Sequence, residues 1–128
     1  MKKTLLALSL TAMLAISLAA QMVTNDKAIR VYAALSSATT TSAFDVSNAL
    51  PTQHTVLLVI TGSPATCTAK LQGSMDGTNW ADLSGSETCT STTTFHVVNK
   101  PILNIRVNVT ALTGGTSPTV TAIYAGTR

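Results

Sequence analysis

An eight-residue stretch, Gly73–Trp80, reads GSMDGTNW and lies between two strand-like runs. Before it, residues 66–72 alternate polar and apolar side chains in the order TCTAKLQ, and residues 80–83 continue as WADL. The Asp76-Gly77 pair favours a tight turn, because glycine accepts the positive φ that a hairpin turn requires. The stretch therefore predicts a β-hairpin. It also holds the only tryptophan, Trp80, whose large apolar side chain we expect to lie in the core.

Outward from this hairpin, short β-type runs follow one another at nearly even spacing. Pro- and Gly-containing turns separate several of them, and no helix is expected after residue 20. With the two arms of the hairpin, these runs make about eight strands. The pattern predicts an all-β fold, an antiparallel β-sandwich or jelly roll. The runs outside the hairpin are residues 28–35, 43–46, 54–61, 88–98, 102–110 and 119–126.

Residues 102–110 have the clearest alternation of apolar and polar side chains. A period of two is typical of a strand with one buried face. Residues 54–61, HTVLLVIT, are instead apolar on both parities, which predicts a central strand covered on both faces. In residues 102–110 the expected buried face is Leu103, Ile105, Val107 and Val109, with Asn104 and Arg106 exposed on the other.

The first twenty residues, MKKTLLALSLTAMLAISLAA, have the layout of a secretory signal. Two lysines precede an uncharged apolar run that ends in small residues. We expect cleavage near Ala19 or Ala20, which leaves residues 21–128 as a single β-sandwich domain. The alternative is an uncleaved N-terminal anchor, which would be the protein's only contact with a membrane. The predicted location is secreted, extracellular or periplasmic.

Charge and length narrow the classes of function. A chain of 128 residues is enough for one domain. It has eight Lys and Arg against five Asp and Glu. Removing Lys2 and Lys3 leaves six against five, a net charge of +1, and the remaining basic residues are scattered. A nucleic-acid binder needs a basic patch to neutralise phosphates, so this class is not expected.

Two cysteines, Cys67 and Cys89, lie in the predicted domain. In an oxidising compartment an even pair in a small domain predicts a disulfide, here closing a loop of 22 residues. The alternative is two buried free thiols. Two isolated cysteines lack the paired spacing of a zinc site, so no metal is expected there.

No combination of residues indicates catalysis. His54 and His96 have no GxSxG or HExxH motif beside them, and the five acidic residues are scattered. We therefore expect a non-enzymatic protein without a cofactor. The weak candidates for ligand binding are Trp80, Asp76 and Asn79.

Two kinds of ligand could bind at these residues, a calcium ion or a sugar. Asp76, Asn79 and Asp82 could place oxygens near a calcium ion, but their spacing does not match an EF-hand, so a turn role for Asp76 is favoured. Trp80 could join Tyr32 and Tyr124 in a sugar-stacking platform if all three were exposed.

Two longer strings carry a resemblance to a known family. They are TGSPATCTAKLQGSMDGTNWADL, residues 61–83, and KPILNIRVNVTALTGGTSPTVTAIYAG, residues 100–126. With their GS-x-DGT-x-W hairpin and RVNVTALTGGTSPTVT ending, they resemble small β-sandwich domains of tailed-phage and prophage virion proteins, over roughly residues 55–126. The resemblance implies a domain that decorates virions or helps attachment, with no catalytic residues to transfer. The chain departs from that family in its leader, which favours an envelope or extracellular role.

These observations predict an exported, non-enzymatic structural or adhesion domain. It could be virion-associated, or it could self-assemble through edge strands, for which residues 28–35 and 119–126 are the candidates. The expected partners are further copies in a homo-oligomer or filament, virion neighbours or a cell-surface glycan. The alternative is a carbohydrate-binding module.

Overall fold

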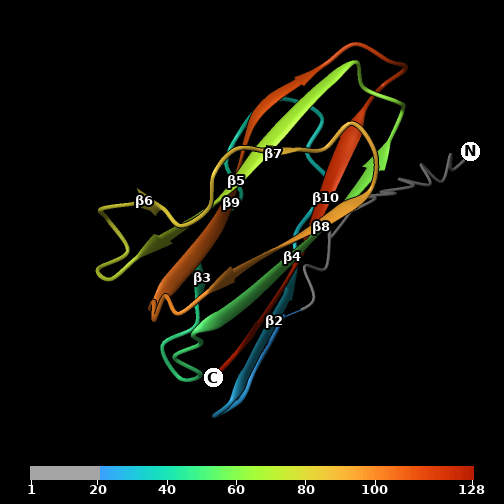
Figure 1. Cartoon of the computed structure of the whole chain (residues 1–128). Helices are drawn as coiled ribbons and strands as arrows, with labels where there is room; N and C mark the ends of the chain where they lie inside the picture. The colour runs from blue at the N-terminus through green and yellow to red at the C-terminus, as the bar shows by residue number, and fades with distance from the viewer. Residues whose placement is uncertain (1–20) are drawn as a thin grey trace, which may run out of the picture.

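The computed structural model of the protein describes residues 21–128, so the expected leader, residues 1–20, lies outside the described residues. Ten strands form two antiparallel sheets, and the described residues contain no helix (Figure 1). The first sheet has the strand order β1-β2-β10-β4-β8, and the second has the order β3-β9-β5-β6, with β7 also paired to β5. The strands are β1 (Gln21–Val23), β2 (Lys27–Val31), β3 (Phe44–Asp45), β4 (Gln53–Thr61), β5 (Thr66–Ser74), β6 (Ala81–Asp82), β7 (Glu87–Thr88), β8 (Thr93–Val98), β9 (Asn104–Thr113) and β10 (Thr119–Thr127).

The all-β, antiparallel sandwich predicted from the sequence is confirmed, with ten strands in place of about eight. One addition is β1, which pairs with β2 in a hairpin. The other arises because the single strand expected over residues 88–98 is two strands in different sheets. β7 pairs with β5, whereas β8 pairs with β4. The chain changes sheet between them, just after Cys89, whose backbone N–H donates to the carbonyl of Cys67 on β5.

The core lies between the two sheets, and β9 contributes one face to it. Ile105, Val107 and Val109 are buried, as their alternation predicts. Leu103, which precedes the strand, is only half-buried, so its expected burial is wrong. The expected exposure of Asn104 and Arg106 is also wrong: both are half-buried. Arg106 packs along its own sheet, which its aliphatic stem allows.

β4 is a central strand, but only one of its faces is covered. His54, Val56 and Leu58 point into the core and are buried. The side chains of the opposite parity are half-buried or exposed rather than buried, so the prediction of two covered faces is wrong. The apolar residues on that second face instead lie on the outside of the first sheet. They include Leu57 and Val59.

The expected edge strands are not at the edges. β10 lies between β2 and β4, and β2 lies between β1 and β10. The nine residues of β10 pair with β4 along their whole length, and Val120, Ala122 and Tyr124 form its buried apolar face. Ala28 and Tyr32 are buried, so this N-terminal segment belongs to the domain's own core. In the part of the chain that the structure describes, β1 and β8 flank the first sheet, and β3 and β6 the second.

Candidate functional site

The predicted hairpin is formed by β5 and β6, with Gly73 opposite Ala81. The connection is a six-residue loop, residues 75–80, rather than a two-residue turn. Gly77 within it has a φ of 74°, the left-handed conformation for which glycine is suited. The loop contains all three candidate ligand-binding residues, Asp76, Asn79 and Trp80.

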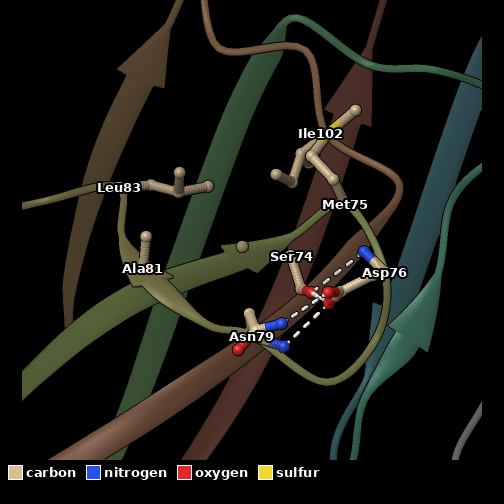
Figure 2. Close-up of a pocket in the computed structure, with 8 residues that line it drawn as sticks. Ser74, Met75, Asp76, Asn79, Ala81, Leu83 and Ile102 are labelled. Carbon is tan, nitrogen blue, oxygen red and sulfur yellow. Dashed lines mark hydrogen bonds between the residues drawn. The ribbon is translucent and has the colours of Figure 1, made fainter.

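The carboxylate of Asp76 organises this loop (Figure 2). Its Oδ1 accepts hydrogen bonds from the backbone N–H groups of Thr78 and Asn79 at 2.8 and 2.7 Å and from Ser74 Oγ at 2.9 Å. Its Oδ2 accepts from Asn79 Nδ2 at 2.6 Å. The bonds from Asn79, followed by those from Thr78 and Ser74, hold the pKa of Asp76 well below its ordinary value. The carboxylate therefore serves the turn, with both oxygens already accepting.

Behind the loop is a surface hollow of about 260 Å³. Its floor is Gly73, where an added Cβ would come within 2.6 Å of Ile102 Cγ1 and 2.8 Å of Leu83 Cδ1. Because glycine has no side chain, Ile102 and Leu83 can close over the strand at this point. Met75, which is 60% exposed, lies at the rim (Figure 2). The hollow is largely apolar; its lining is completed by Ser74, Asp76, Asn79 and Ala81.

Trp80 is outside the core, so the core role expected for it is wrong. Its side chain is half-buried on the outer surface of the second sheet. The guanidinium carbon of Arg106 lies 4.2 Å from the centroid of its ring, a cation–π arrangement. Arg106 Nε in turn donates to Gln72 Oε1 at 2.9 Å. One face of the indole is thus already occupied by a side chain of β9.

The proposed aromatic platform does not form. Tyr32 and Tyr124 are buried, at 3% and 0% exposure, and lie in the core rather than beside Trp80. Burial raises the pKa of Tyr32 to about 12. Phe44 packs edge-on against Tyr124, with ring centroids 6.2 Å apart. Trp80 is therefore without either tyrosine as a stacking neighbour.

The three residues that could bind calcium, Asp76, Asn79 and Asp82, belong to two separate hydrogen-bond networks. Asp76 and Asn79 bond to each other within the loop, whereas Asp82 accepts from Lys70 Nζ and Gln72 Nε2, both at 2.8 Å. These bonds, the one from Lys70 first, lower the pKa of Asp82. Across residues 21–128, no group of three His, Cys, Asp or Glu side chains is placed to hold a metal ion.

The two histidines have different hydrogen-bond partners. His54 is buried, with Nδ1 2.8 Å from Tyr124 Oη and Nε2 2.8 Å from the carbonyl oxygen of Lys100. His96 is exposed on β8, and its Nδ1 lies 3.0 Å from Thr55 Oγ1. Each histidine thus has hydroxyl or backbone partners, and neither pairs with a carboxylate.

The predicted disulfide is present between Cys67 and Cys89, with Cα atoms 4.8 Å apart. Both cysteines are buried in the core. The bond ties β5 to the segment that follows β7, at the place where the chain leaves the second sheet.

The described residues contain no helix long and apolar enough to cross a membrane.

Sequence reasoning did not identify the hollow or the partner of Trp80. The hollow was missed because Ile102 and Leu83, which line it, come from segments that are distant in the sequence. The partner of Trp80 was missed because the alternation of β9 predicts an exposed Arg106. The register Gln72 opposite Arg106 brings the arginine beside the hairpin. One signal was present in the sequence: Gly73 interrupts an otherwise regular strand, which marks close approach of other groups.

No family model and no curated protein matches the sequence. Among solved structures, the fold is similar to the crystal structure of the SPBc2 prophage-derived protein YomS. The TM-score is 0.60 at 18% sequence identity, over 80% of this chain and 94% of that protein. The similarity extends over nearly the whole of YomS and shows a shared fold.

Proposed function

We propose that this chain is a non-enzymatic structural or attachment protein of phage or prophage origin. The observation that carries the proposal is the use of its polar groups within the fold. Both oxygens of Asp76 accept hydrogen bonds inside one loop, and Asp82 is bonded to Lys70 and Gln72. A carboxylate whose pKa is held low by bonds within its own loop is poorly suited to general acid or base catalysis, which supports a structural role for Asp76.

Phage origin is supported by two likenesses. The strings at residues 61–83 and 100–126 resemble virion β-sandwich domains. The fold is similar to that of a prophage-derived protein, YomS, although at 18% identity this comparison concerns the fold alone.

Location outside the cytoplasm is part of the proposal. It is supported by the leader-like sequence of residues 1–20 and by the Cys67–Cys89 disulfide, a bond that persists in oxidising surroundings. The disulfide also fits a domain displayed on a particle, which meets the same surroundings after release. The proposed partners are neighbouring subunits or a cell surface.

Fractionation of cultures tests this proposal. A strain carrying the gene would be treated with a DNA-damaging agent that induces prophages, and the protein would be followed with an antibody through cytoplasm, periplasm, medium and sedimented particles. We expect it in the medium, the periplasm or the particle fraction, with the disulfide intact. Confinement to the cytoplasm with two free thiols would contradict the proposal.

A carbohydrate-binding module is the second candidate, and one observation favours it: Trp80 is half-buried at the surface instead of lying in the core. Against it, Arg106 already covers one face of the ring. Titration of the protein with a panel of glycans distinguishes the two functions. A structural protein keeps its Trp80 emission constant. A saturable shift, lost when Asn79→Ala alters the loop, would favour sugar binding.

A further inference from the structure

The outer surfaces of the two sheets differ sharply in chemistry. On the second sheet, outward side chains form a polar network: Lys70 with Asp82, Gln72 with Arg106, and Thr68 Oγ1 with Thr110 Oγ1 at 2.7 Å. Such a surface is typical of a sheet face in water. The first sheet belongs to the same small domain, so a similarly polar outer face would be expected there.

The centre of the outer face of the first sheet is instead apolar, with threonines around it. The register places Ile123 of β10 between Val31 of β2 and Leu57 of β4, and Ala125 opposite Ile29. These residues have the parity opposite to the buried Tyr124 and Val56, and they are half-buried. We call this surface the apolar face; it comprises Met22, Ile29, Val31, Leu57, Val59, Ile123 and Ala125.

Charge is nearly absent from the apolar face. Among the described outward residues of this sheet, the ionisable groups are Lys27 on β2 and His96 on β8, both away from the central row of Val31, Ile123 and Leu57. Four of the polar side chains on this face bond to one another: Thr61 Oγ1 lies 2.7 Å from Thr119 Oγ1, and Thr55 Oγ1 lies 3.0 Å from His96 Nδ1. Thr94 and Thr121 face outward beside the apolar residues. The face therefore lacks the charge that would recognise a charged partner.

We propose that this apolar face is an interface between two copies of the chain, packed face to face about a two-fold axis. In a two-fold interface a patch meets itself, so any strong charge would oppose its own sign. A surface without central charge is compatible with that symmetry. A twisted sheet is also well matched in shape by a second sheet of the same hand, as in the packing of two sheets of a sandwich.

The size of the face is adequate for such a contact. Its two longest strands, β4 and β10, have nine residues each, and a nine-residue strand spans about 30 Å. The other three strands are shorter, with three residues in β1, five in β2 and six in β8. At about 3.3 Å per residue and about 4.8 Å between strands, the sheet covers roughly 500 Å² in projection. Two copies would then bury about 1,000 Å² in total, the lower end of the range for a specific interface, which predicts a weak dimer.

Within the first sheet, the most exposed large apolar side chains lie on the two flanking strands. Met22 on β1 is 49% exposed and Val98 at the end of β8 is 54% exposed, and these strands are the two flanks of the sheet. Beside Met22, a shallow hollow of about 150 Å³ is lined by Gln21, Ile29 and Val31. Large apolar side chains left open around an apolar sheet mark an interaction surface.

The test measures the mass of the protein in solution. The product recovered from cells expressing the full chain would be run through size-exclusion chromatography with light scattering between about 1 and 100 µM, the range that detects micromolar dissociation constants. We expect a dimer. Ile123→Lys, which places two like charges at the centre of the interface, should weaken association by at least about 100-fold. Val31→Thr, a polar residue of the same shape, should weaken it less and keep the fold.

A matched control keeps the interpretation specific. Thr110→Lys introduces the same charge on the outer face of the second sheet and should leave the dimer unchanged. Circular dichroism checks that every variant is folded. Ile123→Cys gives a second measurement, since the native cysteines are already paired. A short bismaleimide should couple two copies at position 123, whereas Thr110→Cys should give little coupled product.

Three outcomes would overturn the proposal. The first is a parent protein that remains monomeric throughout the concentration range. This includes a monomer whose measured mass shows that residues 1–20 are still present and whose Ile123→Cys variant is protected from thiol labelling. The second is a dimer that persists in folded Ile123→Lys, which would place the contact at a strand edge such as β1. The third is a dimer in which position 123 is not coupled.

Discussion

His54 and Tyr124 share a buried hydrogen bond, with His54 Nδ1 2.8 Å from Tyr124 Oη. The other ring nitrogen, Nε2, lies 2.8 Å from the carbonyl oxygen of Lys100. A carbonyl only accepts, so Nε2 donates to it. Burial favours the neutral imidazole, in which Nδ1 then accepts from the tyrosine hydroxyl. The two bonds link β4 and β10 to the turn before β9.

This pairing predicts a loss of stability in mild acid. Burial lowers the pKa of His54 in the folded protein, so the unfolded chain takes up its proton at higher pH than the folded one. The stability contributed by neutral His54 is then fully present above the unfolded pKa of about 6.5 and is lost as the pH falls below it. Urea unfolding at a series of pH values between about 5 and 8 measures the slope.

Two variants isolate the contribution of His54. His54→Gln should flatten the dependence on pH in this window, while His96→Gln, at an exposed position, should retain the dependence of the parent. Tyr124→Phe leaves His54 Nδ1 without a donor and should lower the free energy of unfolding by about 1–3 kcal/mol. An unchanged slope in His54→Gln would show that another group titrates.

A second prediction tests the register of β9. Val107 is fully buried, so Val107→Asp places an unpaired carboxylate in the core and should lower the free energy of unfolding by at least about 4 kcal/mol. Asn108→Asp, at the neighbouring position of opposite parity, should cost much less. Chemical denaturation of both proteins gives the comparison. Equal losses would mean that the two side chains do not face opposite sides of the sheet.

The sequence was most informative where one strand carried a complete pattern. Alternation of side chains identified Ile105, Val107 and Val109 of β9 as buried, and Asp76-Gly77 located the hairpin. It was least informative where the outcome depended on strand order. Which strands lie at an edge is decided by pairings between distant segments, so β10 was wrongly expected at an edge.

The predictions of a buried Trp80 and of a single strand over residues 88–98 were wrong for a related reason. Composition favours a buried tryptophan, but the six-residue loop places Trp80 against Arg106 on the outer surface of the second sheet. The Thr-rich run keeps one parity through Cys89, Phe95 and Val97, so it reads as a single strand. All three are buried, yet the chain crosses from one sheet to the other between them.

A third prediction concerns the disulfide. Cys67 and Cys89 are 22 residues apart. In the chain-entropy model, closing a loop of that length lowers the entropy of the unfolded chain and so raises the free energy of unfolding by about 3 kcal/mol. The double variant Cys67→Ala with Cys89→Ala should therefore unfold at clearly lower urea concentration than the parent. Thiol labelling of the unreduced, unfolded parent should find no free cysteine. Two labelled thiols, or equal stability of the double variant, would contradict the prediction.

The last prediction concerns the contact between Arg106 and Trp80. The arginine covers one face of the indole at 4.2 Å and donates to Gln72, so its removal should uncover the ring. Arg106→Ser is expected to shift Trp80 emission to longer wavelength and to increase its quenching by acrylamide. The stability cost should be about 1 kcal/mol, because an exposed cation–π contact contributes about 0.5–1 kcal/mol. Arg106→Lys is the matched control: it keeps the charge but lacks the planar group, so its emission should lie between those of the parent and Arg106→Ser. Since Trp80 is the only tryptophan, the signal has a single source. Unchanged emission and quenching in Arg106→Ser would show that the arginine does not cover the ring in solution, and the open indole would then be available to a ligand.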